Sequence, residues 1–426
     1  MNHRRLLDRF LRYVRIDTTA VPEAPHFPSS PGQIELGRLL VDELQAVGIA
    51  DAAQNSLGIV TATVPASLQR PLPVIALCAH LDTSPEAPGN NVQPQVLIDY
   101  RGGDVPLPRT PHQVIRVAEN PVLRSLVGQT LVTSDGTTLL GADDKAGVAV
   151  IVETAAFLME HPEIIHGPIR LVFTCDEEVG RGVDHLDPAM IGAVACYTLD
   201  SEGTDRIDVE TFSADEVEVV VRGRGIHPSI AKDRMVNAVR AAAAFLARLP
   251  RHHLSPESTE GRQGFLHPYT VHGGVQEVRL RVLVRDFDTG LLGHHADILR
   301  QAAEVTMAEF PGLSVTLTTR AQYRNLAEGL HKEPRAAAYA EEALRRLDRH
   351  PQRSIVRGGT DGARLTEKGL PTPNLSTGQH VPHSLTEWAC LEEMAAACRG
   401  LVALAEVWAE GPPVLPTGEQ VTPLPR

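Results

Sequence analysis

The sequence predicts an α/β protein in which a second, α+β unit is inserted into a domain built on a mostly parallel sheet flanked by helices. Short apolar runs alternate with helical patterns over residues 1–208. The elements of residues 209–324 follow the order β-α-β-β-α-β, which is typical of a ferredoxin-like unit. Helix–strand alternation then resumes over residues 325–410. We therefore expect one catalytic domain in two parts, an inserted domain between them, and a Pro-rich tail over 411–426.

The elements of the first part follow from periodicity and capping signals. Residues 3–15 place leucines at helical spacing, and Ser30 and Pro31 offer a cap and first-turn residue for a helix that ends before Gly48. Residues 84–128 are rich in Pro, Gly and Asn and predict a long surface excursion with at most a small hairpin. The other predicted elements are strands at 57–64, 73–79, 169–175 and 194–199 and a helix at 148–160.

The inserted unit is predicted in the same way. An Ala-rich helical pattern covers 232–249, and a long alternating strand covers 274–286. The remaining elements are strands at 215–223, 269–272 and 313–319 and a helix at 291–310, and the final helix of the catalytic domain is expected at 391–410.

Composition and charge exclude several classes of partner. The 426 residues contain 40 Lys and Arg against 53 Asp and Glu, a formal charge of −13 that would repel nucleic acid or an anionic membrane. There is no uncharged apolar run of about 18 residues, so no membrane span is expected. The five cysteines are sparse, and the charged N-terminus lacks the apolar core of a signal peptide. We therefore expect a cytoplasmic protein without nucleic-acid or membrane partners.

A histidine and an aspartate end the second predicted strand. The segment PVIALCAHLDTS carries an apolar run into His80 and Asp82, which alternation points the same way. A metal-binding imidazole needs an acceptor at its other nitrogen, and a carboxylate two residues along can supply one. Taken alone, the pair is more often an ordinary strand-end turn.

Four further clusters follow strands or precede a helix, and they favour a metal site. In an open α/β sheet the carboxyl ends of parallel strands share one crevice, so these groups should converge there. Adjacent acids repel one another unless a cation gathers them. A set of His and carboxylates without Cys suits catalytic zinc, with manganese or cobalt as substitutes. The clusters contain Asp143 and Asp144; Asp176, Glu177 and Glu178; Asp200; and His380 and His383.

Motifs for other chemistries are missing from the sequence. It has no Gly-x-Ser-x-Gly elbow, no P-loop, no dinucleotide glycine pattern after a strand and no His-Glu-x-x-His helix. The sequence therefore shows no recognisable site for a nucleophilic serine or a nucleotide cofactor.

Several segments resemble the two-zinc metallopeptidase family that holds tripeptide aminopeptidases, aminoacylases and glutamate carboxypeptidases. In the catalytic domain they are AHLDTS, GADDKAG, TCDEEVGRG, YTLDS and GGTDGARLTEKGLPTPN. In the inserted domain they are IHPSIAKDRMVNA, PESTEGRQGF and VRDFD, which resemble the lid of the tripeptide aminopeptidases. The resemblance covers roughly residues 1 to 410 and implies a zinc-peptidase catalytic domain with an inserted lid and dimerisation domain.

The resemblance also implies a role for each candidate residue. One zinc would be held by His80, Asp143 and Asp200 and the other by Asp143, Glu178 and His383, which the register of the following helix favours over His380. Asp82 would orient His80, and Glu177 would be the general base for a hydroxide that bridges the metals. The implied substrate-binding residues are His227, Asn237, Arg285 and Arg357.

The expected function is removal of the N-terminal residue from tripeptides by a two-zinc aminopeptidase, acting on small peptides in peptide catabolism. The resemblance implies a homodimer formed through the lid domain. The alternatives are a related zinc dipeptidase, deacylase or carboxypeptidase on the same scaffold, or a metal-binding protein without catalysis.

Overall fold

The computed structural model describes residues 1–413 and divides them into two compact units. The first unit contains residues 1–209, 329–354 and the chain from 360, and the second contains 210–328 and 355–359. The prediction of a tail over 411–426 falls mostly on residues outside the described part. The roles of the second unit as a lid and in dimerisation stay predictions.

The first unit is built on a mixed sheet of 11 strands within the described residues, in the order β1-β2-β8-β3-β9-β16-β17-β7-β4. In addition, β10 pairs with β16, and β15 pairs with β10. Its strands are β1 (Ala53–Gln54), β2 (Val60–Val64), β3 (Ile75–His80), β4 (Gln95–Leu97), β7 (Leu131–Thr133), β8 (Ile169–Thr174), β9 (Ala195–Glu202), β10 (Arg206–Thr211), β15 (Gln352–Val356), β16 (Asn374–His380) and β17 (Trp388–Cys390). The four neighbours β8, β3, β9 and β16 are parallel, whereas the pairs towards both edges are antiparallel. The predicted α/β class is confirmed, with the parallel part confined to the centre.

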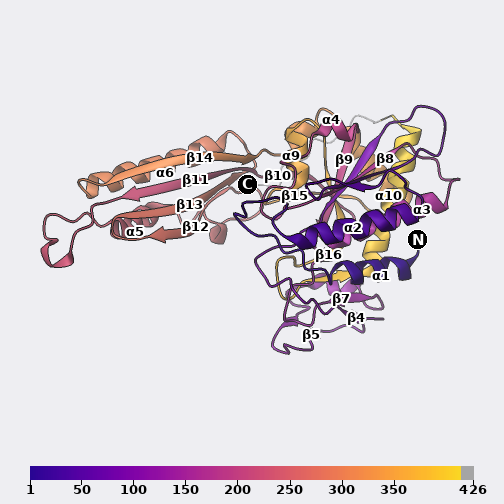
Figure 1. Ribbon diagram of the computed structural model, residues 1–426, viewed down its shortest axis with the longest axis horizontal. Coiled ribbons are helices and arrows are strands. Elements are labelled where there is room, and N and C mark those ends of the chain that lie inside the picture. The colour runs from indigo at the N-terminus through magenta and orange to yellow at the C-terminus, as the bar shows by residue number, and fades with distance from the viewer. Residues whose placement is uncertain (414–426) are drawn as a thin grey trace. The chain divides into compact units, whose positions relative to one another are not determined.

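Helices lie on both sides of this sheet (Figure 1). They are α1 (His3–Tyr13), α2 (Pro31–Ala46), α3 (Ala142–Glu160), α4 (Pro188–Ile191), α8 (Arg335–Arg346), α9 (Asp361–Glu367) and α10 (Leu391–Glu410), and the short α7 (Ala327–Leu330) spans the boundary between the two units in the sequence. Helix α3 packs on β3, β9 and β16, and α1 and α10 pack against α3. Helices α4 and α9 contribute Ile191 and Leu365 to a separate apolar cluster with Cys78 and Cys196 of the sheet. All five cysteines are buried and free.

The excursion at 84–128 contains the expected small hairpin, formed by β5 (Val105–Pro106) and β6 (Val114–Ile115), and a 3-10 helix at Pro121–Ser125. Its strand β4 also joins the main sheet by pairing with β7. The apolar side chains of this region pack with Trp388, which is fully buried. The segment is therefore anchored to the sheet on its β4–β7 side.

The second unit has the predicted ferredoxin-like order. Its elements are β11 (Ser213–Arg222), α5 (Ala238–Arg248), β12 (Phe265–Gly273), β13 (Glu277–Asp286), α6 (Leu291–Glu309) and β14 (Ser314–Tyr323), with 3-10 turns at Pro228–Ile230 and Pro256–Ser258. The sheet order is β12-β13-β11-β14, with every pair antiparallel. Alternating valines and leucines of β11 and β13 form its core with α5 and α6.

Several predicted strands differ from the observed ones at their ends, as β12 does by beginning at Phe265 rather than at 269, and two predicted helix starts are wrong for identifiable reasons. The helix expected at 232–249 begins only at Ala238, because the Asn237 side chain accepts hydrogen bonds from the N–H groups of Val239 and Arg240 and caps the helix there. The helix expected from Val148 begins earlier, at Ala142. The sequence pattern did not mark this first turn, because the turn contains the polar Asp143–Asp144 pair rather than apolar residues.

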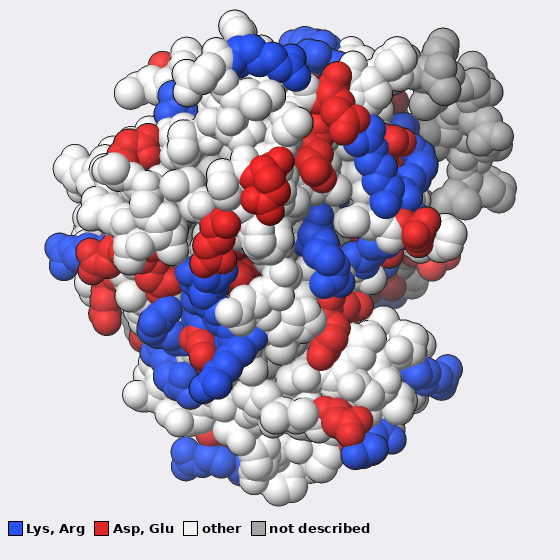
Figure 2. Space-filling model, turned by 90° about the vertical axis from the view of Figure 1, so that its right-hand side faces the viewer, with Lys and Arg blue, Asp and Glu red and all other residues white. Residues whose placement is uncertain are grey.

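The surface agrees with the mixed charge of the sequence. On the face in Figure 2, basic and acidic side chains lie next to one another between larger uncharged areas. Within residues 1–413, no helix combines the length and apolar character needed to cross a membrane.

Candidate metal centre

The candidate metal ligands come together at the carboxyl edge of the parallel strands. Strand β3 ends at His80, its neighbour β9 carries Asp200, and Glu178 follows the other neighbour, β8. Asp143 lies in the first turn of α3, and His383 lies in the loop between β16 and β17. The structure thus joins five residues from segments that are far apart in the sequence, as expected from the shared edge of a parallel sheet.

Asp143 lies between two histidines. Its Oδ1 is 3.0 Å from Nε2 of His80, and its Oδ2 is 3.3 Å from Nε2 of His383. His80 Nε2 also lies 3.8 Å from Asp200 Oδ1, and His383 Nε2 lies 2.9 Å from Glu178 Oε2. Ligand atoms of His80, Asp143 and Glu178 fall within 4.8 Å of one another. Each oxygen of Asp143 therefore faces one group of donors, which is the arrangement a bridging carboxylate needs.

Asp82 connects both sides of this centre. Nδ1 of His80 is 3.4 Å from Asp82 Oδ1 and 3.1 Å from its backbone oxygen, which agrees with the predicted orienting contact. In addition, the Asp82 carboxylate accepts the N–H groups of Glu177 and Glu178, each at 3.0 Å. Its side chain is fully buried. One carboxylate therefore fixes the histidine after β3 and the acidic turn after β8.

The acidic groups are perturbed by burial and by one another. Burial, assisted by Asp143, raises the pKa of Glu178 to about 8 and that of Asp200 to about 7. Burial likewise raises the pKa of Glu177 well above its usual value. Burial alone would lower the pKa of His383, but hydrogen bonds to Asp143 and Glu178 raise it to about 12. A bound cation would stabilise the ionised form of these buried carboxylates.

The donor set fits divalent metal ions. Among the described residues, nothing hydrogen-bonds Oε1 of Glu178, although that atom is buried. An unpartnered buried carboxylate oxygen is costly unless a cation or water reaches it. Imidazole and carboxylate donors without thiolate are the ligands of catalytic zinc and related ions.

The neighbouring acids have other partners. Asp144 also lies near His80 and Asp200, but its oxygens already accept the backbone N–H groups of His80 at 3.1 Å and Gly147 at 3.2 Å. Asp176 accepts hydrogen bonds from Ser29 and Gln33 and so anchors the chain before α2. These contacts give both aspartates supporting roles next to the candidate ligands.

The choice between the two C-terminal histidines follows from their surroundings. His380 is buried, its Nε2 is 2.6 Å from Oε2 of Glu393, and its ring stacks on Trp388 at 3.8 Å. His383 instead faces Asp143 and Glu178 from a left-handed loop position, with φ 59°. The geometry therefore favours His383, the histidine expected from the sequence.

The sequence missed two buried acids next to this centre. Glu387 accepts backbone N–H groups from the segment that carries Asp143. Asp361, in the first turn of α9, accepts the hydroxyl of Thr174 at the end of β8 at 2.6 Å. Asp361 lay within a quoted motif, GGTDGA, which was a usable signal, whereas nothing local marked Glu387.

The four predicted substrate-binding residues belong to the second unit. His227 is exposed, with Nδ1 2.7 Å from Ser229 Oγ, and Asn237 caps α5. Arg357 donates to backbone oxygens of Gly261, Gln263 and Thr259. Arg285 is buried, with its guanidinium over the ring of Tyr323. Their roles towards substrate stay predictions.

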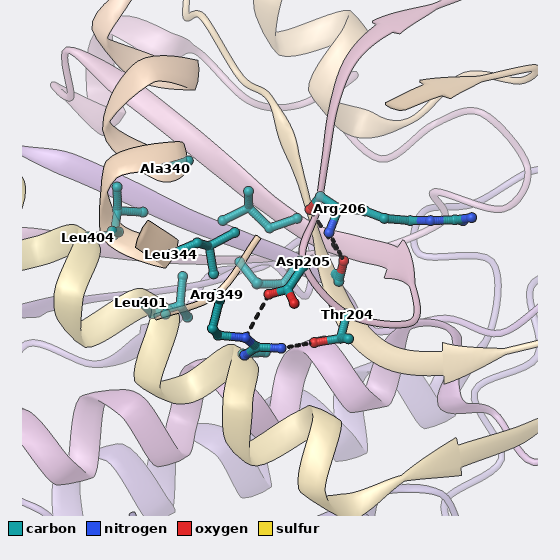
Figure 3. Close-up of a pocket in the computed structure, with 14 residues that line it drawn as sticks. Thr204, Asp205, Arg206, Ala340, Leu344, Arg349, Leu401 and Leu404 are labelled. Atoms are coloured by element: carbon teal, nitrogen blue, oxygen red, sulfur yellow. Dashed lines mark hydrogen bonds and ion pairs between the residues drawn. The ribbon is translucent and has the colours of Figure 1, made fainter. Parts of the chain in front are cut away.

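A separate pocket in the first unit lies between α8, α10 and the strands (Figure 3). Leu344, Leu401 and Leu404 supply much of its lining. Two of its charged groups pair with each other, since Nε of Arg349 is 2.7 Å from Oδ1 of Asp205. The pocket therefore offers packing surface rather than reactive groups.

The fold and the site define a class: an α/β protein with a candidate two-metal centre at the carboxyl edge of its parallel strands. The sequence model of peptidase family M20/M25/M40 matches residues 135–407. Peptidase T from Geobacillus thermodenitrificans (strain NG80-2) is 38% identical over 403 residues, 95% of this chain and 98% of that protein. The chain therefore belongs to peptidase family M20/M25/M40 and is a hydrolase, as the resemblance predicted.

Two solved structures are similar to this chain over nearly its whole length. Aminopeptidase PepT from Bacillus cereus ATCC 10987 has a TM-score of 0.72 at 25% identity, covering 96% of this chain and 99% of that one. A tripeptidase from Staphylococcus aureus subsp. aureus Mu50 has a TM-score of 0.75 at 24% identity, with coverage of 96% and 99%. Both share the fold over nearly their full lengths.

Proposed function

We propose that this peptidase is a two-metal aminopeptidase that removes the N-terminal residue from tripeptides. The observation that carries the proposal is the placement of Asp143 between His80 and His383, each facing a different oxygen of the same carboxylate. The matches to Peptidase T and to an aminopeptidase structure support the substrate class.

Two zinc ions fit the donor set, with manganese or cobalt as substitutes. His80, Asp143 and Asp200 would hold one ion, and Asp143, Glu178 and His383 would hold the other. When bound, such ions polarise a peptide carbonyl and lower the pKa of water, so that hydroxide is available near neutral pH. The unpartnered Oε1 of Glu178 and the pKa values raised at Glu178 and Asp200 support this assignment.

Glu177 is the proposed general base. Its backbone is fixed next to Glu178 by the Asp82 carboxylate, so the two adjacent side chains can take different tasks. Glu178 serves the metal, while Glu177 takes a proton from the attacking water and passes it to the leaving amine. Asp82 is a positioning residue, because it acts through His80 and through the acidic turn.

Recognition of the substrate ends is the least constrained step. His227 is proposed to hydrogen-bond the oxyanion, Arg285 and Arg357 to bind the substrate carboxylate, and Asn237 to contact the peptide backbone. A guanidinium fork matches a carboxylate, which supports the two arginines. A requirement for both peptide termini would explain a preference for tripeptides.

The resemblance also supports a homodimer through the second unit and a cytoplasmic location, and five free cysteines are compatible with a reducing compartment. Sedimentation equilibrium at several protein concentrations measures the mass directly. A mass near that of one 46.1 kDa chain throughout would contradict the dimer.

The test of the proposed function is a matched series of peptides. Zinc-loaded protein is assayed against a dipeptide, a tripeptide, a tetrapeptide and the same tripeptide with its amine acetylated. We expect cleavage of the free-amine tripeptide only, abolished by a chelator and restored by zinc. Equal or better cleavage of the acetylated peptide would instead assign a deacylase or carboxypeptidase, and preferred cleavage of the dipeptide would assign a dipeptidase.

A further inference from the structure

One buried side chain holds the segment that carries Asp143. Oε2 of Glu387 accepts the N–H groups of Leu140 at 2.8 Å and Gly141 at 2.7 Å, and its Oε1 accepts the N–H of Asp143 at 2.9 Å. Glu387 is 1% exposed, so water does not compete for these bonds. Charge-assisted hydrogen bonds of this kind are among the stronger ones in proteins.

This segment cannot satisfy its own backbone groups. The first N–H groups of any helix lack intrahelical partners and are usually met by a side chain at the N-cap. The N-cap of α3 is Gly141, which has a left-handed φ of 80° and no side chain to offer. Asp143 and Asp144 also depart from helical φ and ψ. Glu387, which is distant in the sequence, therefore caps the start of α3.

The same loop also carries a candidate ligand. His383 lies four residues before Glu387, between β16 and β17, and its Nε2 faces Asp143 and Glu178. Strand β17 begins directly after Glu387 and pairs with both β16 and β7. The loop is thus held at both ends by the sheet, and Glu387 is placed by a rigid element.

We propose that Glu387 is a positioning residue for the metal centre: it fixes the backbone of Asp143 so that the two carboxylate oxygens point to two metal positions. This inference rests on the proposed two-metal function. It assigns to one loop both a ligand, His383, and the support of the bridging ligand, Asp143. Loss of Glu387 should then weaken metal binding in a protein that still folds.

The experiment compares Glu387→Gln with Glu392→Gln. Glutamine has the shape of glutamate, but its NH₂ group would face at least one of the three N–H donors. Glu392 is a matched control, because its Oε2 accepts the N–H of Thr130 at 2.8 Å, outside the segment of Asp143. Zinc affinity is measured by competition with a chelating indicator, and thermal unfolding of the metal-free proteins is measured alongside.

We expect Glu387→Gln to bind zinc about 10- to 100-fold more weakly than the wild type, as is usual for groups that support metal ligands. Glu392→Gln should bind zinc as the wild type does. Should Glu387→Gln not fold, Glu387→Asp keeps the charge and should show an intermediate affinity. A folded Glu387 variant with wild-type affinity would overturn the positioning role. A wild-type protein that does not bind two zinc ions would instead overturn the proposed function.

Discussion

Replacing Asp82 with Asn tests how the acidic turn after β8 is held. The Asp82 carboxylate accepts two backbone N–H groups at 3.0 Å, from Glu177 and Glu178, and is fully buried. Asparagine has one oxygen and one NH₂ group, so one of the two bonds becomes a contact between donors. Loss of a hydrogen bond to a buried charged group costs about 1.5–3 kcal/mol.

If this lost free energy raises the activation barrier by displacing Glu177 and Glu178, kcat/KM for a tripeptide decreases about 10- to 150-fold, because 1.36 kcal/mol corresponds to a tenfold change. The assay is the initial rate of tripeptide hydrolysis at saturating zinc. Asp187→Asn is the control, because Asp187 also accepts a backbone N–H, that of Ala189 at 2.9 Å, at the exposed start of α4. Wild-type kcat/KM in a folded Asp82→Asn protein would refute this reasoning.

Three further predictions concern stability, measured by urea unfolding. Glu153 is fully buried and binds two arginines of α1, so Glu153→Ala should lower the free energy of unfolding by about 3–5 kcal/mol. A decrease as small as that for an exposed ion pair would contradict the prediction that these ion pairs act as buried ones. A Cβ at Gly147 would lie 2.0 Å from the backbone oxygen of Leu199, so Gly147→Ala should cost about 1–3 kcal/mol. Gly293→Ala in α6 meets no neighbouring atoms and should stabilise by about 0.5–1 kcal/mol; equal effects of the two alanines would contradict the packing argument.

The sequence predicted the parts of the site that have local signals. His80 and Asp200 end or follow apolar runs, and the parallel sheet then requires their side chains to share an edge. Helix α10 was predicted with its observed bounds, because its apolar periodicity is long and Gly411 follows it. In the structure Gly411 has the left-handed φ that is common at the end of a helix. The ferredoxin-like unit was predicted from the order of its helices and strands, which have clear periodic patterns.

The rest depended on long-range contacts. The partners of Glu387 lie 244 to 247 residues earlier in the chain, so no local pattern could mark it. Strands β10 and β15, with the sequences RIDVET and QRSIV, were missed because short strands with several polar residues carry little periodicity. The second task of Asp82 was missed for the same reason, since it bonds residues 95 and 96 positions away.

In the proposed function, Glu177 moves the proton while its neighbours hold the metals. The most direct test is Glu177→Gln, with zinc content and turnover of a tripeptide measured on the same preparation. We expect two zinc ions per chain, as in the wild type, and a turnover lowered by about 10²- to 10⁴-fold, the usual contribution of general acid–base catalysis. Wild-type turnover in the zinc-loaded variant would contradict it.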